Sequence, residues 1–194
     1  MKKKNIAIFA SGEGTNAQKI IDYFKSSNTI KVALIVSNKS AANVLNRAKS
    51  ANIPILILNK EDFYKTNNAV QQLVPYNVDF IVLAGFLWMV PDSLIKVFPY
   101  KIINIHPALL PKFGGKGMYG LNVHKAVLEA KEKESGITIH YVNENYDDGE
   151  IIAQIPININ ANETAESLSN KIHNLEYQIY PQAIELVINA HFKS

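Results

Sequence analysis

Short runs of Ile, Val and Leu alternate along the chain with segments whose apolar residues recur at helical spacing. The apolar runs are NIAIFA, KVALIVS, IPILIL, DFIVLAG and KIINI, and the first four are followed by NAQKIIDYFK, AANVLNRAKSA, DFYKTNNAVQQLV and PDSLIKVF. Strands that are apolar on both faces and separated by helices are typical of a parallel sheet covered on both sides. The pattern therefore predicts a Rossmann-like, doubly wound α/β fold.

The pattern changes after Ile105. Residues 107–122 contain four glycines and no apolar periodicity, which predicts a long loop of the kind that often covers or binds a ligand. A helix is predicted from about Val123 to Lys133. GITIHYV and EIIAQIPI then read as two strands around the turn NENYDDG, an antiparallel hairpin at the sheet edge. The last helix is predicted from Thr164 to about Ala190, kinked or divided by Pro181.

Length and composition favour one soluble globular domain over residues 1–194. The apolar runs predict about seven strands in it, with helices on both faces. The net charge is only +3, and the basic residues are spread along the chain apart from residues 2–4, so nucleic acid is not an expected partner. With no cysteine, disulfides and thiolate sites are excluded, and a cytoplasmic location fits best. No run approaches the ~18 apolar residues of a membrane span, so no membrane association is expected.

The loop SGEGTNA follows the first strand and opens a helix. Gly12, Gly14 and Ala17 match G-x-G-x-x-G/A, in which backbone N–H groups at a helix N-terminus approach a phosphate. A dinucleotide site usually has an acidic residue at the end of the second strand, where this chain has VSNK. The loop therefore favours a phosphate monoester over a dinucleotide, with Thr15 and Asn16 adding side-chain hydrogen bonds. A purely structural turn is the alternative.

Asn104 and His106 lie two residues apart near the end of the fifth strand, so both side chains project from one face. Ligands of open α/β sheets bind at the carboxyl ends of the strands. An Asn can donate a hydrogen bond to a developing oxyanion, and a His can transfer a proton. The alternative is an ordinary strand-end His bonded to a backbone carbonyl.

The turn NYDDGEII supplies two carboxylates, Asp147 and Asp148. Asp before Gly is common in turns for conformational reasons alone. A carboxylate next to His106 would favour the charged imidazolium and raise its pKa. The sequence leaves open whether either residue reaches it.

Two further patterns concern the remaining histidines and an apolar stretch after the fourth strand. The remaining histidines, His124, His140, His173 and His191, lack metal-binding spacing, so no metal site is expected. The stretch LAGFLWMV is typical of a core, although Gly85 could expose residues 86–90 to a ligand.

The motifs ASGEGTNAQ, LAGFLW, NIHPALLP, YDDGEII and LEYQIYP occur in this order over nearly the whole chain. Together they resemble the folate-dependent formyltransferases, and among them the phosphoribosylglycinamide formyltransferase family of purine (IMP) biosynthesis. HPxLLP with a downstream Asp-x-Gly is shared by several such formyltransferases, whereas SGxGTN and the LExxIYP ending narrow the resemblance to this one.

The resemblance implies 10-formyltetrahydrofolate as donor cosubstrate, glycinamide ribonucleotide as acceptor, no metal, and a monomer or homodimer. It implies a catalytic set of Asn104, His106 and Asp147, in which Asp147 keeps His106 charged near pH 7. The implied ribonucleotide-binding residues are Gly14, Thr15, Asn16, His173 and Glu176. The implied folate-binding residues are Leu87, Trp88, Met89, Val90, Asn104, Asn143, Glu144, Asn145, Tyr146 and Asp147. The family often has a basic residue where Trp88 stands and an Arg near Lys65 or Thr66.

Four alternatives share parts of this pattern. Methionyl-tRNA formyltransferase adds a C-terminal tRNA-binding domain, and formyltetrahydrofolate hydrolase adds an N-terminal regulatory domain. A nucleotide-binding sensor would need only the first loop, and an NAD dehydrogenase would use the same loop for a dinucleotide.

Overall fold

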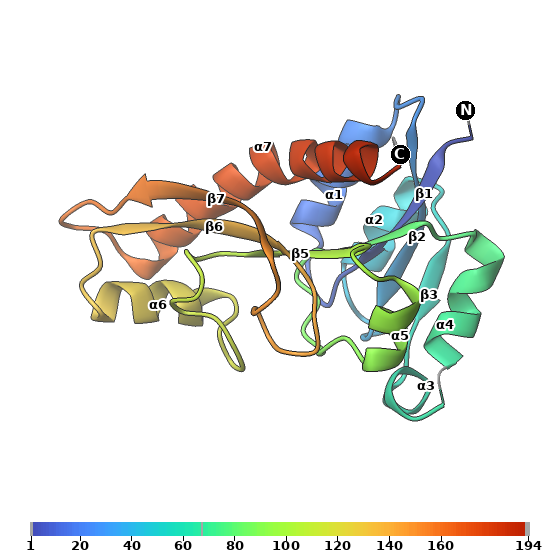
Figure 1. The fold of residues 1–194 in the computed structure, drawn as a ribbon. Helices are drawn as coiled ribbons and strands as arrows, with labels where there is room; N and C mark the ends of the chain where they lie inside the picture. Colours follow the sequence, from blue (N-terminus) through green and yellow to red (C-terminus); the bar gives the residue numbers. More distant parts are fainter. Residues whose placement is uncertain (1, 67, 193–194) are drawn as a thin grey trace.

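The computed structural model describes residues 2–66 and 68–192 and has a seven-stranded sheet with helices on both faces (Figure 1). The strands are β1 (Lys4–Phe9), β2 (Ile30–Ser37), β3 (Ile55–Ile57), β4 (Phe80–Leu83), β5 (Ile102–His106), β6 (Glu134–Tyr141) and β7 (Ile151–Asn158). Their order in the sheet is β3-β2-β1-β4-β5-β6-β7. The first five strands pair in parallel, and β6 and β7 form an antiparallel hairpin at the edge. The predicted fold class is confirmed.

Two apolar clusters, one on each face, form the core. Along β1, Ile6 and Ile8 enter one cluster while Ala7 and Phe9 enter the other, as expected when alternate side chains of a strand point to opposite faces. The first cluster is covered by α1 (Thr15–Phe24), α2 (Val44–Ser50), α6 (Leu121–Glu129) and α7 (Ala165–His191). The second is covered by α3 (Lys60–Tyr64), α4 (Asn68–Leu73) and α5 (Asp92–Val97).

Two helices differ from the sequence predictions. DFYKTNNAVQQLV forms α3, α4 and the 3-10 turn η1 (Val74–Tyr76) instead of one helix. The carboxylate of Asp62 stabilises the break, because it accepts hydrogen bonds from Asn68 and Gln72 across the junction. Asn67, within this prediction, lies outside the described residues. Helix α6 begins and ends earlier than the predicted range of 123–133.

Pro181 does not divide the last helix, because α7 runs unbroken from Ala165 to His191. A proline inside a helix removes one backbone hydrogen bond, so other contacts must stabilise the helix on both sides of it. Pro181 is buried, and the neighbouring Tyr180 hydroxyl donates to the carbonyl oxygens of Leu83 and Ile103 at 2.8 and 3.3 Å. These contacts fasten the middle of α7 to the last residue of β4 and to the second residue of β5.

The register of the sheet brings several polar residues to the end of β5. Asn104 lies opposite Leu83 of β4 on one side and His140 of β6 on the other, and His106 lies opposite Thr138. No helix in the described part of the chain combines the length and apolar character needed to cross a membrane.

Candidate active site

Three side chains from two distant segments meet at the end of β5. The Asp147 Oδ2 atom lies 3.4 Å from His106 Nδ1, and Asn104 Nδ2 donates to Asp147 Oδ1 at 3.3 Å. His106 is buried, at 3% exposure. The structure thus brings together the amide, the imidazole and the carboxylate that the sequence analysis grouped as a catalytic set.

The turn between β6 and β7 selects Asp147 rather than Asp148 for this position. Asp148 Oδ2 accepts hydrogen bonds from the side-chain amides of Asn143 and Asn145, at 3.4 and 3.1 Å, and so stabilises the turn itself. Asp147 has a left-handed backbone, with φ of 52°. Gly149 lets the turn approach β6 closely, since a Cβ there would lie 1.8 Å from the Tyr141 carbonyl oxygen. The structure therefore resolves the choice that the sequence left open.

The loop after β5 also contacts this cluster. The Phe113 carbonyl oxygen accepts from His106 Nε2 at 2.7 Å, and the Gly115 N–H donates to Asp147 Oδ2 at 3.0 Å. Below these contacts, the Thr138 hydroxyl accepts from the Leu110 N–H and donates to the Ala108 carbonyl. The start of the loop is therefore held by β6 and by the catalytic candidates themselves.

Burial and the local charges act in opposite directions on the pKa of His106. Burial lowers it below the ordinary value, and the raising effects of Asp147 and the Phe113 carbonyl do not fully offset this. Both ring nitrogens face an acceptor, whereas a neutral imidazole has only one N–H. The expectation that Asp147 keeps His106 charged near pH 7 is corrected for the free protein, because burial outweighs the carboxylate.

The pKa of Asp147 is lowered even though burial acts to raise it. The nearby His140 and His106 rings and the Gly115 N–H all favour the ionised carboxylate, and together they outweigh burial. Asp147 is therefore a fixed negative charge, placed where an imidazolium at residue 106 would form.

His140 is a member of this cluster that the sequence analysis did not single out. Its Nδ1 donates to the Tyr141 carbonyl at 2.8 Å, which leaves Nε2 of a neutral ring to accept from Asn104 Nδ2 at 3.2 Å. Nε2 also lies 3.7 Å from Asp147 Oδ1. Only the β5–β6 register could have identified this residue, because it places His140 opposite Asn104.

A second group of predicted residues meets between α1 and α7. Asn16 Nδ2 donates to Glu176 Oε2 at 2.8 Å, and His173 lies one turn before Glu176 and stacks on Tyr177. Burial raises the pKa of Glu176 to about 7, against a smaller lowering effect of the Asn16 bond. Burial also lowers the pKa of His173. Two predicted ribonucleotide-binding segments, far apart in sequence, are therefore adjacent.

The raised pKa of Glu176 predicts a pH-dependent stability. A carboxyl with a raised folded-state pKa stabilises the protein fully below its unfolded pKa, and this contribution is lost as the pH rises through about 7. Relative to Glu176→Gln, wild type should lose about 2 to 3 kcal/mol of unfolding free energy between about pH 5 and about pH 8. Urea denaturation at several pH values measures this difference. Parallel stability curves for the two proteins would contradict the assignment.

Gly14 in the first loop is required by packing as well as by its backbone. It has φ of 69°, and a Cβ there would lie 2.5 Å from Val44 Cγ2. Thr15 begins α1, whose first turn contains no acidic residue. This N-terminus suits an anion, although the glycine itself is explained by the contact with α2.

The predicted folate-binding stretch is only partly accessible. Leu87 and Met89 are each 38% exposed, but Phe86 and Val90 are buried in the second core cluster. The expectation that Gly85 exposes all of residues 86–90 is therefore wrong, because alternate side chains turn inward. Trp88 packs against the rings of Phe63 and Tyr64, with centroids 5.5 and 5.8 Å away. The predicted turn residues Glu144, Asn145 and Tyr146 are exposed.

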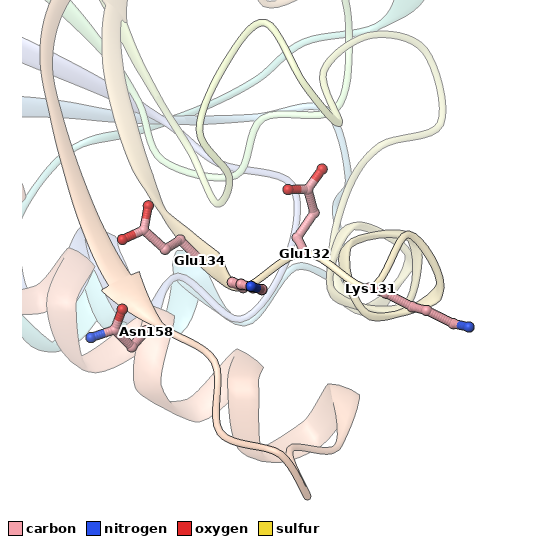
Figure 2. Close-up of a pocket in the computed structure, with 5 residues that line it drawn as sticks. Lys131, Glu132, Glu134 and Asn158 are labelled. Carbon is pink, nitrogen blue, oxygen red and sulfur yellow. The ribbon is translucent and has the colours of Figure 1, made fainter.

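An open surface hollow of about 500 Å³ lies elsewhere, at the start of β6 (Figure 2). It is lined by Lys131, Glu132, Lys133, Glu134 and Asn158. Figure 2 shows Lys131 pointing away from the other labelled side chains, and Glu132 is paired with Lys112. These groups do not converge on a common point, so the β5 cluster remains the candidate site. Within residues 2–66 and 68–192, no group of three or more His, Cys, Asp or Glu side chains could hold a metal ion.

Comparison with known proteins assigns the family. The formyl transferase family model matches residues 4–184. The chain belongs to the formyl transferase family. The resemblance to phosphoribosylglycinamide formyltransferase that the motifs indicated is also confirmed by individual relatives of this family.

Two curated relatives and one solved structure illustrate the similarity. The chloroplastic phosphoribosylglycinamide formyltransferase of Arabidopsis thaliana is 40% identical over 99% of this chain and 68% of its own length. The phosphoribosylglycinamide formyltransferase of Bacillus subtilis is 37% identical over 95% of both chains. The crystal structure of the Bacillus halodurans phosphoribosylglycinamide formyltransferase has a TM-score of 0.87 and 38% identity, covering 97% of this chain and 100% of that one. The chain is thus an enzyme of the formyl transferase family with the fold of these relatives.

Proposed function

We propose that the chain, acting as one domain, transfers a formyl group from 10-formyltetrahydrofolate to the amine of glycinamide ribonucleotide. The observation that carries the proposal is the contact of Asp147 with both His106 and Asn104, at 3.4 and 3.3 Å, in a member of the formyl transferase family. The similarity to phosphoribosylglycinamide formyltransferases supports the choice of acceptor.

The reaction makes three chemical demands. The neutral amine of the acceptor attacks the formyl carbon, and the carbonyl oxygen becomes an oxyanion in the tetrahedral intermediate. The attacking nitrogen then loses one proton, and N10 of the folate gains one as it leaves as a neutral amine. The site must therefore stabilise a negative oxygen and move one proton from nitrogen to nitrogen.

Asn104 meets the first demand by donating an N–H to the oxyanion. In the free protein both amide hydrogens of Asn104 point at acceptors, namely His140 Nε2 and Asp147 Oδ1. These contacts orient the amide before substrate binds, and at 3.2 and 3.3 Å they are long enough to be exchanged for a charged acceptor.

His106 meets the second demand as general acid. Burial lowers the pKa of His106 in the free protein and so favours the neutral ring. A neutral ring has a nitrogen lone pair that can take up the proton released by the attacking amine. The oxyanion and Asp147 then both favour the imidazolium, which donates its proton to N10. Asp147 raises the pKa of His106 relative to a site without the carboxylate, although not above the ordinary value.

The remaining predicted residues divide between the two substrates. Gly14, Thr15 and Asn16 bind the ribonucleotide phosphate at the start of α1, and His173 and Glu176 hold the rest of that substrate. Leu87, Trp88 and Met89, with residues 143–147 of the turn, form the folate side of the site. Val90 supports this wall from the core, since it is 3% exposed.

A two-substrate assay tests the proposal. The ultraviolet absorbance of 10-formyltetrahydrofolate should change on deformylation only when the protein and glycinamide ribonucleotide are both present. Binding of the ribonucleotide without turnover would instead indicate a sensor. An absorbance change without the acceptor would indicate hydrolysis of the formyl folate. Either result would contradict the proposed transfer.

A further inference from the structure

His124 is a buried imidazole that the proposed mechanism does not use. It lies in the first half of α6 at 1% exposure, and its Nδ1 has no hydrogen-bond partner among the described residues. Buried polar side-chain atoms are normally paired, because an unpaired one loses its bonds to water without replacement. An unpaired ring nitrogen in this position therefore needs an explanation.

The surroundings of His124 connect the two halves of the candidate site. Helix α6 packs against α7, which carries His173 and Glu176. The ring is close enough to both His173 and His106 that their charges lower its pKa, although burial is the larger cause of its fall to about 4. His124 thus lies near the ribonucleotide-binding candidates and near the catalytic imidazole.

The chemistry of the ring limits what it can bind. A pKa of about 4 makes the imidazole neutral at neutral pH, so one nitrogen donates and the other accepts. A neutral ring of this kind pairs well with a hydroxyl or an amide and adds no charge to attract a phosphate. The proposed acceptor offers both kinds of group, in its ribose hydroxyls and in its glycinamide amide.

The loop between β5 and α6 immediately precedes the helix that carries His124. It leads directly into α6 and contains Gly115, Gly117 and Gly120, each with positive φ. Phe113 and Met118 of the same loop pack against the first core cluster, which includes Val123. Because His124 is only 1% exposed, a contact between its ring and the acceptor requires residues 116–120 to shift when the acceptor binds, and Gly117 and Gly120 give the backbone that freedom.

We propose that His124 is a binding residue whose ring hydrogen-bonds a hydroxyl or amide of the ribonucleotide acceptor. The inference rests on the proposed function, because it names a contact within the same site. It also explains why the fold retains an unpaired polar atom between α6 and α7.

The test compares His124→Phe with His124→Asn, because Phe removes both ring nitrogens and Asn keeps a polar group near Nδ1. Loss of one hydrogen bond to the acceptor should raise the KM for glycinamide ribonucleotide roughly tenfold in His124→Phe. The KM for 10-formyltetrahydrofolate should stay within about twofold of wild type, and His124→Asn should recover most of the affinity. His191→Phe, near the far end of α7, is the control for loss of a histidine.

A purely structural role gives a different result. If His124 only fills space, His124→Phe should have the wild-type KM for the ribonucleotide and an equal or higher Tm, since an unpaired polar atom has been removed; this would overturn the proposal. If that variant does not fold, ¹⁵N NMR of the His124 ring in wild type decides the matter. A shift of the ring nitrogen signals on adding glycinamide ribonucleotide supports the contact, and unchanged signals reject it. Failure of wild type to turn over the two substrates would refute the proposed function instead.

Discussion

Asn104→Ala is expected to lower kcat for formyl transfer by about 100- to 1000-fold, the usual loss when one oxyanion donor is removed. The KM values should change little, because the oxyanion exists only after attack and not in the bound ground state. Steady-state kinetics with both substrates varied measures the two effects separately.

The control for this prediction is Asn158→Ala. Asn158 also lies on a strand, but at the end of β7 and beside the surface hollow of Figure 2. It should retain wild-type turnover. If Asn104→Ala turns over within a few-fold of wild type, Asn104 has no part in the chemical step.

Asp147→Asn is expected to lower kcat by about 100- to 10,000-fold, the range for losing general acid–base assistance. Removing the carboxylate removes the main influence that raises the pKa of His106, so that pKa should fall further below its ordinary value. The imidazolium needed to protonate N10 would then be less accessible. An NMR titration of the His106 ring, together with the pH dependence of kcat, measures both consequences.

Asp148→Asn is the matched control for the neighbouring carboxylate. Its side chain bonds the amides of Asn143 and Asn145 within the turn. The Asp148→Asn variant should therefore leave the pKa of His106 unchanged, and it should reduce turnover far less than Asp147→Asn does. The same imidazole pKa in wild type and in Asp147→Asn would reject the electrostatic role of Asp147.

The fold could be predicted from sequence because its signals are local and repeated. Each strand of the parallel part is a continuous apolar run, and each crossover has helical spacing. The sequence predictions were wrong for helices whose course is set by contacts with distant residues and not by the local preference of the chain. Asp62 ties two short helices together across a break, and Tyr180 with its neighbours helps α7 to continue through Pro181.

The candidate site could be predicted only in part. Asn104 and His106 follow from strand alternation, and Asp147 was one of two open choices until the turn geometry decided it. His140 could be identified only from the pairing of β5 with β6, which places it opposite Asn104. No local sequence pattern predicts that pairing. The sequence prediction also missed that burial lowers the pKa of His106. A carboxylate such as Asp147 is visible in the sequence, whereas the removal of water from the ring depends on the packing of the folded chain.

The central claim is that Asp147 contacts both the oxyanion donor Asn104 and the general acid His106, so that these three side chains act as a single unit. Single-turnover rates of Asn104→Ala, Asp147→Asn and the double variant test it most directly. Residues that act as a unit are not additive, so the double variant should be little slower than the slower single variant. If the two losses multiply instead, the residues act independently and the account is wrong.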